Sequence, residues 1–266
     1  MLEVGQVVSD ATAVFAQRDT GVRFEWGLAG ARAVTQHGAA VVVVDVLSFS
    51  TAATVAVGRG TAVYPHRWPS PDAEAFARAH QAVCAVRRRA VDADHPWSRS
   101  PSHLLAAPTV ERLVLPSPNG SAIAAEVTAA AVLAGCLRNA TAVARWLSAH
   151  DFGRPDRPVV VIAAGERWPD GELRPALEDL LGAGAVIVGL PPDLKRSPEA
   201  SAAEAAWHAQ RDQLRDAVRS CSSGRELIDA GYPEDVDLAS EPDTDPIVPL
   251  LIESAFRRAD TAPEPC

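Results

Sequence analysis

Short β-branched segments alternate with helical segments over most of this chain, and this alternation restricts the fold more than any other feature of the sequence. Residues 39–46 (AAVVVVDV) form an apolar run typical of a strand that is buried on both faces. Residues 50–60 then read as a helix that ends at Gly58 or Gly60. The same strand–helix order returns several times further along the chain. It predicts an α/β fold, a three-layer α/β/α sandwich with a largely parallel or mixed sheet.

The remaining elements follow from the same patterns. Strands are predicted at residues 61–68, 82–87, 111–116, 131–137 and 157–165, with a weaker one at 21–27. Helices are predicted at residues 70–81, 121–130, 139–150 and 176–184, and the chain is expected to be helical from about residue 199. Ser70 is the expected N-cap of the helix at 70–81, with Pro71 in its first position. Residues 185–190 fit either a strand or a buried helix end, and residues 234–251 fit a closing loop and an edge strand.

The length and the linkers bear on domain organisation. A chain of 266 residues suits one large α/β domain or two small ones. No clear boundary interrupts the pattern, so a single domain over residues 1–266 is expected, with two lobes as the alternative. Residues 87–102 are polar, contain two prolines and read as a long loop of the kind that is often functional. The tail, residues 259–266, is expected to be disordered.

Composition narrows the class of function. The formal charge of −9 argues against nucleic acid or an anionic membrane as the main partner, but it does not exclude a small anionic substrate. Lys195 is the only lysine, which excludes a P-loop and argues against a Schiff-base mechanism. The four cysteines show no C-x-x-C spacing, so a structural zinc site is not expected. The N-terminal residues resemble neither a signal peptide nor a membrane span, which predicts a cytoplasmic protein.

Four predicted strands end in groups of hydroxyl, amide, carboxylate and glycine residues. The groups are Asp45, Ser48, Ser50 and Thr51; Ser117, Asn119, Gly120 and Ser121; Arg138 and Asn139; and Gly165, Glu166 and Arg167. Open α/β sheets bind ligands at the carboxyl ends of their strands, so in a parallel sheet all four groups would share one rim. The helix starts found there offer free N–H groups, which bind anions and phosphate above all. Each group by itself also fits an ordinary helix N-cap.

Carboxylates on the same rim would repel a phosphate unless a divalent cation lay between them. Asp45 together with Glu166, Glu178 or Asp179 therefore predicts Mg²⁺, which takes oxygen ligands and substrate phosphate together. Glu178 and Asp179 fit a solvated helix face equally well. The common phosphatase signatures are absent, because no acid stands two residues after Asp45 and neither C-x₅-R nor G-x-S-x-G occurs. The residues alone thus predict an anion and metal site without naming a reaction.

Five segments, taken in order, resemble the 2-phosphosulfolactate phosphatase family. They cover residues 41–65, 114–124, 132–147, 160–187 and 222–249. The resemblance implies an α/β/α fold and a Mg²⁺-dependent phosphatase. It further implies hydrolysis of 2-phosphosulfolactate to sulfolactate and phosphate, a step of coenzyme M biosynthesis.

Residue roles carry over only where the motifs match. Asp45 matches the family's strand-end Asp, Asn119 and Gly120 its Asn-Gly turn, Asn139 its later helix-start Asn, Gly165 its strand-end Gly, Glu178 and Asp179 its Glu-Asp pair, and Asp235 and Asp243 its acids near the C-terminus. Together with the strand-end pattern, this predicts Asp45, Asn119 and Asn139 as catalytic; Ser48, Ser50, Thr51, Gly120, Ser121, Arg138 and Gly165 as substrate-binding; and Asp45, Glu166, Glu178 and Asp179 as metal ligands. The attacking group is either a metal-activated water or a carboxylate such as Asp45.

One departure from the family bears on the substrate. The family commonly reads D-V-L-R where this chain has Ser48, and an arginine there would clamp a phosphate or sulfonate. Arg99 and Arg138 are the candidates for the missing positive charge. Two alternatives follow, a phosphatase acting on a different phosphorylated hydroxy acid and a small-anion binding protein without hydrolysis. A homodimer is the default assembly.

Overall fold

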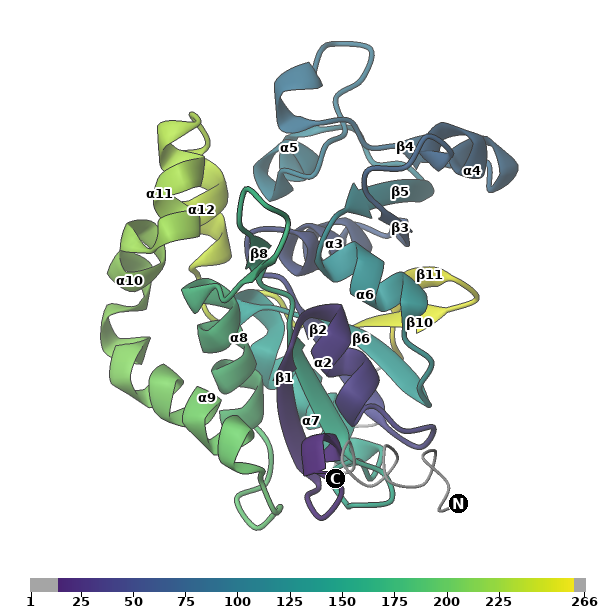
Figure 1. Ribbon diagram of the computed structural model, residues 1–266. Helices are drawn as coiled ribbons and strands as arrows, with labels where there is room; N and C mark the ends of the chain where they lie inside the picture. Colours follow the sequence, from purple (N-terminus) through teal and green to yellow (C-terminus); the bar gives the residue numbers. More distant parts are fainter. Residues whose placement is uncertain (1–13, 261–266) are drawn as a thin grey trace, which may run out of the picture.

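A computed structural model describes residues 14–260, and its strands form a nine-stranded sheet in the order β1-β7-β2-β6-β10-β11-β3-β5-β4 (Figure 1). These strands are β1 (Val22–Trp26), β2 (Ala40–Val44), β3 (Ala62–Arg67), β4 (Val83–Cys84), β5 (Arg112–Ser117), β6 (Ala131–Gly135), β7 (Val159–Ala163), β10 (Pro249–Ile252) and β11 (Ala255–Arg258). A separate hairpin pairs β8 (Glu166–Arg167) with β9 (Leu173–Arg174). The predicted strand at 39–46 is β2, and the weaker prediction at 21–27 is β1.

Helices cover both faces of this sheet. They are α2 (Gly27–Val34), α3 (Phe49–Gly58), α4 (Ala73–Ala79), α5 (Pro101–Ala106), α6 (Gly120–Glu126), α7 (Ala140–Ala149), α8 (Leu177–Val188), α9 (Pro198–Gln210), α10 (Leu214–Ser220), α11 (Ser222–Asp229) and α12 (Pro233–Ala239). Val42 and Val44 pack with α7 and α8 on one face, whereas Val41 and Val43 pack with α2, α3 and α6 on the other. Successive side chains of a strand point to opposite faces, so a run of four valines fits this position. The predicted α/β sandwich is confirmed.

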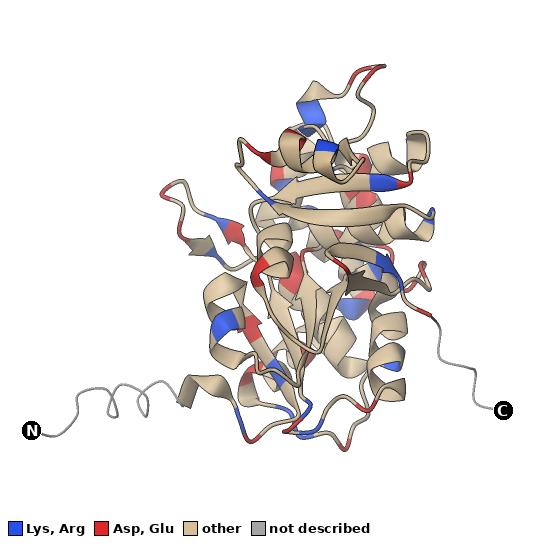
Figure 2. Cartoon of the chain, turned by 90° about the vertical axis from the view of Figure 1, so that its right-hand side faces the viewer, with Lys and Arg blue, Asp and Glu red and all other residues tan. Residues whose placement is uncertain are grey.

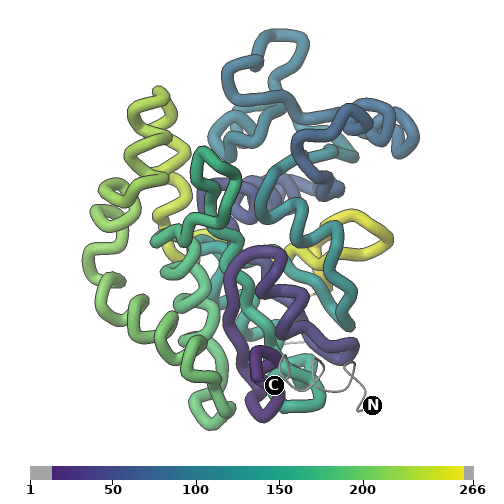
Figure 3. Tube along the Cα trace, viewed as in Figure 1, coloured from purple at the N-terminus to yellow at the C-terminus, as the bar shows by residue number. Residues whose placement is uncertain are grey.

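The sheet is mixed because a C-terminal hairpin joins two parallel halves. Strands β1, β7, β2 and β6 are parallel to one another, as are β3, β5 and β4. The hairpin of β10 and β11 lies between the halves and pairs antiparallel with β6 and with β3, through one residue pair on each side. The two halves therefore run in opposite senses, and in Figure 1 strands β3 and β5 cross the direction of β1 and β2. Figure 3 shows the C-terminal segment returning to this central position.

The expectation of a closing loop and an edge strand at residues 234–251 is wrong. Residues Pro233–Ala239 form α12, and β10 is an inner strand with a partner on either side. The residues of a short apolar segment do not show which strands will pair with it. The sequence therefore could not distinguish an inner position in the sheet from an edge position. Of the two alternatives for residues 185–190, the buried helix end is correct, because α8 continues to Val188.

Two further boundaries differ from the prediction. The helix predicted at 70–81 begins at Ala73 with Asp72 as N-cap residue. The hydroxyl of Ser70 instead accepts a hydrogen bond from the N–H of Asp72 at 3.2 Å, which makes a local turn ahead of the helix. The strand predicted at 82–87 contracts to the two residues of β4.

Charged residues lie on the helices and in the loops as well as at the ends of strands, as Figure 2 shows. No helix within residues 14–260 is long and apolar enough to cross a membrane. The predicted disorder of the tail falls mainly on residues 261–266, which lie outside the described residues. The single-domain interpretation of residues 1–266 stays a prediction.

Candidate active site

Asp45 follows β2 directly and contributes to the lining of a cavity of about 410 Å³. Its Oδ1 accepts a hydrogen bond from the N–H of Phe49 at 3.0 Å, and its Oδ2 accepts one from the N–H of Gly120 at 2.8 Å. Phe49 begins α3 and Gly120 begins α6, so one carboxylate joins the helix starts that follow β2 and β5. This bond brings the carboxyl end of a strand from each half of the sheet to the same cavity.

Gly120 is required by the closeness of this contact. A Cβ atom at position 120 would lie 2.7 Å from both the Cβ and the Oδ2 of Asp45 and 2.8 Å from Cδ1 of Phe49. Contacts below about 3 Å between such atoms force the neighbours to move. The glycine of the predicted Asn-Gly turn is therefore needed for steric reasons. The absence of a side chain at Gly120 lets the backbone approach Asp45.

Asn119 and Glu166 lie together on the wall of the cavity. The side-chain amide of Asn119 donates a hydrogen bond from Nδ2 to Oε2 of Glu166 at 2.9 Å. Asn119 precedes α6, and Glu166 begins the β8–β9 hairpin that follows β7. Burial, and then the neighbouring carboxylates of Asp45 and Glu178, raise the pKa of Glu166 to about 7.

Two more carboxylates, Glu178 and Asp179, stand in the first turn of α8 and are buried. Asp179 accepts hydrogen bonds from the N–H of Val46 at 2.7 Å and of Gly165 at 2.8 Å, one on each oxygen. Burial, followed by repulsion from Asp45 and Glu178, raises the pKa of Asp179 well above its usual value. Asp179 therefore fixes the segments that follow β2 and β7.

Glu178 has a different neighbour, the thiol of Cys221. The thiol sulfur lies 3.3 Å from Oε2 of Glu178 and 3.1 Å from the carbonyl oxygen of Val218, and either oxygen can accept its one hydrogen. Burial raises the pKa of this thiol to about 12, so the sulfur keeps its proton and acts as a donor. Burial also raises the pKa of Asp45. Four acidic side chains thus share one region in which full ionisation is opposed by desolvation and by mutual repulsion.

The donor set can be tested against the predicted Mg²⁺. Within residues 14–260, no three His, Cys, Asp or Glu side chains are placed to hold a metal ion among themselves. Mg²⁺ commonly takes only one or two protein carboxylates and completes its shell with water and substrate phosphate. Asp45 and Glu166, two of the three acids that line the cavity, fit that pattern. A cation would offset the burial and the repulsion from Asp45 and Glu178 that raise the pKa of Glu166. Mg²⁺ itself stays a prediction.

Arginines form another part of the cavity wall. Arg87, Arg88, Arg89 and Arg99 all line the cavity, and all come from the long loop predicted at residues 87–102. Arg99 was predicted from the sequence as a candidate positive charge, but the three arginines at residues 87–89 were not. Their position at the start of a long polar loop is the feature that could have indicated them. Burial and the charge of Arg88 lower the pKa of Arg99, while the Asp45 and Glu166 carboxylates act in the opposite direction. Positive and negative groups therefore meet in one cavity.

Comparison with known proteins shows which family the chain belongs to. Residues 30–254 match the family model described as 2-phosphosulpholactate phosphatase. The chain belongs to that family. It is also 26% identical over 219 residues to a protein of Pseudothermotoga lettingae named probable 2-phosphosulfolactate phosphatase, an alignment that covers 81% of this chain and 90% of that protein. The predicted resemblance is confirmed, and membership makes the chain a phosphatase, a phosphoric monoester hydrolase.

Several residues predicted to bind substrate in this phosphatase donate their side-chain hydrogen bonds to backbone carbonyl groups. Ser50 donates to the carbonyl of Val43 at 2.7 Å, Thr51 to that of Val46 at 2.8 Å, and Ser121 to that of Leu115 at 2.9 Å. All three hydroxyls are buried, and none of the three residues is among those that line the cavity. They satisfy carbonyl groups where the strands β2 and β5 end. Their contact with substrate stays a prediction that the geometry does not support.

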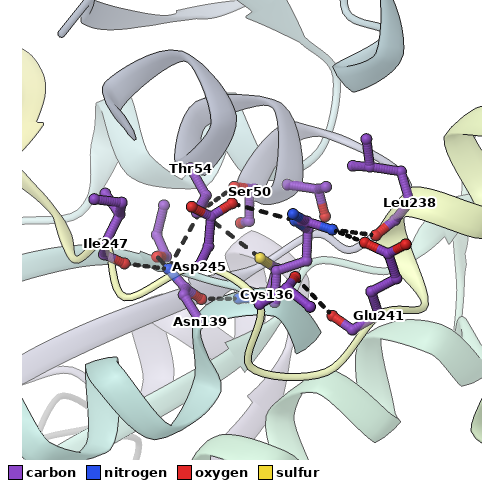
Figure 4. A network of polar contacts seen from close by, with 12 residues as sticks. Ser50, Thr54, Cys136, Asn139, Leu238, Glu241, Asp245 and Ile247 are labelled. Atoms are coloured by element: carbon purple, nitrogen blue, oxygen red, sulfur yellow. Dashed lines mark hydrogen bonds and ion pairs between the residues drawn. The ribbon is translucent and has the colours of Figure 1, made fainter. Parts of the chain in front are cut away.

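Gly165 and the β6 group also stand apart from the cavity lining. Gly165 has a φ of +67°, in the left-handed region that favours glycine, and its N–H donates to Asp179. Asn139 is fully buried. Its Nδ2 donates to the carbonyl of Ile247 at 3.0 Å (Figure 4) and to that of Ala134 at 3.2 Å. Asn139 therefore anchors the start of α7 to the segment before β10.

Arg138 belongs to the same network, and its partners Leu238, Glu241 and Asp245 are labelled in Figure 4. Its guanidinium pairs with Glu241 at 2.5 Å and with Asp245 at 3.3 Å, and donates to the carbonyl of Leu238 at 2.9 Å. Asp243 in the same segment accepts from the N–H of Thr141 at 2.8 Å, at the start of α7. Of the four strand-end groups, those after β2, β5 and β7 reach the cavity, and the group after β6 holds the C-terminal segment in place.

Proposed function

We propose that this chain hydrolyses a small phosphate monoester that carries a second anionic group, in a reaction that depends on Mg²⁺. The ester named by the family and by the relative, 2-phosphosulfolactate, is the first substrate to test, with sulfolactate and phosphate as products. One observation carries the proposal: a cavity whose wall holds the carboxylates of Asp45 and Glu166 as well as four arginines.

The guanidinium groups of Arg88 and Arg99 act on each other, but they have different carboxylate neighbours. Asp45 and Glu166 are among the charges that act on Arg99, whereas Arg88 is paired with Asp235. A phosphate placed between the carboxylates and Arg99 would have a cation site on one side and a guanidinium on the other. Arginine suits this role because its planar fork matches the oxygens of phosphate, carboxylate and sulfonate.

The residues of this chain have separable tasks in such a reaction. Asp45 and Glu166 would hold Mg²⁺, which supplies neutralisation of the phosphate charge and polarisation of the phosphorus–oxygen bonds when bound. Asn119 orients Glu166 through its amide, and Asp179 fixes the loops that carry Asp45 and Glu166. The ester bond between phosphorus and oxygen breaks, and the departing oxygen takes a proton to give the alcohol. The oxygen that attacks phosphorus comes either from water, which gives phosphate directly and supplies the proton, or from the Asp45 carboxylate, whose acyl phosphate a water molecule then hydrolyses to release phosphate.

The test is steady-state phosphate release by the purified full-length chain. The panel contains 2-phosphosulfolactate, phospholactate, 2-phosphoglycerate and 4-nitrophenyl phosphate, each with Mg²⁺ and with EDTA. We expect turnover with Mg²⁺, loss of turnover in EDTA, and the highest kcat/KM for an ester with a second anionic group. Glu166→Gln should reduce kcat strongly, while Glu172→Gln, an exposed carboxylate on the same hairpin, is the matched control.

Each failure has a distinct meaning. Equal turnover in EDTA would contradict the role of Mg²⁺. Preference for an ester other than 2-phosphosulfolactate would identify a phosphatase for a different hydroxy acid, an alternative that the serine at position 48 favours. No turnover of any ester, together with tight binding of phosphate in calorimetry, would contradict the enzyme proposal and favour a small-anion binding protein.

A further inference from the structure

We infer that Ser48 and Asp235 are positioning residues that hold Arg88 at the cavity wall, where Arg88 contacts an anionic group of the substrate other than its phosphate, either its carboxylate or its sulfonate. This inference rests on the proposed phosphatase function and assigns a task to three residues within it. It concerns specificity and substrate binding rather than the chemical step.

Two side chains fix the guanidinium of Arg88. Its Nε pairs with Oδ2 of Asp235 at 2.9 Å, and its Nη2 donates to Oγ of Ser48 at 2.7 Å. The hydroxyl of Ser48 in turn donates to the carbonyl of Arg99 at 3.1 Å. Because a hydroxyl has a single hydrogen, this donation leaves the Ser48 oxygen as an acceptor toward Arg88. Ser48 therefore links two arginine-bearing segments of the same cavity wall.

Asp235, the ion-pair partner of Arg88, is itself held in place by hydrogen bonds. Its side chain is fully buried, and its Oδ1 accepts hydrogen bonds from the hydroxyls of Ser100 at 2.6 Å and Ser102 at 2.7 Å and from the N–H of Ser102 at 3.1 Å. Those bonds leave Oδ2 for Arg88. A buried carboxylate is stable only when it is paired and hydrogen-bonded, so Asp235 ties Arg88 to both α12 and the start of α5.

The hydrogen bonds of Arg88 leave one nitrogen of its guanidinium group for a ligand. Within residues 14–260, Nη1 of Arg88 has no hydrogen-bond partner, and the residue lines the cavity. Its Cζ atom lies 5.7 Å from the centroid of the Tyr232 ring, which supports one face of the guanidinium. Arg87, by comparison, lies over the Trp68 ring, and Arg89 is exposed. Arg88 is thus the member of the run whose direction is set by polar contacts on two sides.

The place of Arg88 selects which anionic group it meets. The carboxylates of Asp45 and Glu166, which would hold the metal and phosphate, act on the charge of Arg99, as does the guanidinium of Arg88. The carboxylate that Arg88 itself pairs with is Asp235. A substrate whose phosphate occupies the Asp45 end would extend its second anionic group, a carboxylate or a sulfonate, toward Arg88. Both groups present oxygens that a guanidinium binds in the same way.

The experiment compares Ser48→Ala and Ser48→Thr with wild type on two esters. One is 2-phosphosulfolactate, and the other is 4-nitrophenyl phosphate, which lacks a second anionic group; phospholactate separates a carboxylate contact from a sulfonate contact. We expect Ser48→Ala to raise KM for 2-phosphosulfolactate about tenfold, the usual effect of losing one hydrogen bond to a charged group, with kcat nearly unchanged. Its KM for 4-nitrophenyl phosphate should change much less, and Ser48→Thr should restore the wild-type KM for 2-phosphosulfolactate. Ser201→Ala, an exposed serine on α9, is the matched control.

Other results would overturn the inference. Equal KM values for wild type and Ser48→Ala would do so, as would a rise in KM of the same size for both esters, which indicates a general structural defect. If no ester is hydrolysed, the proposed function fails, and calorimetry with sulfolactate then decides the inference alone. Binding that Ser48→Ala weakens about tenfold supports it, whereas equal binding or no binding by wild type overturns it.

Discussion

Replacing Glu166 by glutamine should stabilise the metal-free protein, and it should do so in a pH-dependent way. Glu166 is held in a place where ionisation is unfavourable, because burial and the carboxylates of Asp45 and Glu178 raise its pKa to about 7. Glutamine has the same shape, and its carbonyl oxygen can still accept the hydrogen bond from Asn119. The substitution therefore removes the charge while it keeps the contact.

The size of the effect follows from the two pKa values. The carboxyl titrates at about 7 in the folded protein, against an ordinary value of 4.5. As pH rises through 4.5, the unfolded chain releases the proton first, so the wild type loses stability until pH exceeds about 7. At about 1.4 kcal/mol per pH unit, the complete loss is about 3 kcal/mol. Glutamine does not titrate, so the variant should gain about 3 kcal/mol over wild type at pH 8.5 and about 1 kcal/mol at pH 5.

Urea unfolding in EDTA at these two pH values measures the difference. The exposed Glu172→Gln variant removes the same formal charge from the same hairpin and is the control for a general charge effect. A gain that is equal at both pH values, or a loss of stability at pH 8.5, would refute the electrostatic reasoning. Added Mg²⁺ should make the wild type more stable than Glu166→Gln. A ligand that binds only the folded protein stabilises most the variant that binds it most tightly.

Three further predictions test other parts of the site. Gly120→Ala should lower the free energy of unfolding by about 1–3 kcal/mol and reduce kcat, since its Cβ would displace Asp45; thermal melting and phosphate release check this, and an unchanged kcat would contradict it. Asn139→Ala should lower the free energy of unfolding by about 3 kcal/mol while the folded fraction keeps its KM and kcat; a large fall in kcat at full folding would restore a catalytic role for Asn139. Arg99→Gln should raise KM for 2-phosphosulfolactate at least about tenfold at low salt and less at high salt; a salt-independent effect would argue against charge pairing.

Much of the architecture is local in origin and could be predicted. The valines of β2 are buried on both faces, as a run without polar alternation requires. Asp45 follows that strand at its carboxyl end, where α/β sheets bind ligands. The Asn119–Gly120 pair marked the corresponding turn after β5. These conclusions depend on the spacing of apolar residues, on the residues at strand ends and on the residue types of turns, all of which are properties of short segments.

The tertiary structure decided which of these side chains reach the cavity. Ser50, Thr51, Ser121 and Asn139 have the residue types of an anion site, yet each is bonded to backbone that the sequence could not identify as its partner. The arginines of the long loop, the pairing of Arg88 with Asp235 and the insertion of β10 and β11 between the two halves join segments far apart in the chain. Hydrogen bonds and charges act between neighbours in space. The sequence alone therefore determined most of the strands and helices and their polar ends, and folding determined which of those ends became the site.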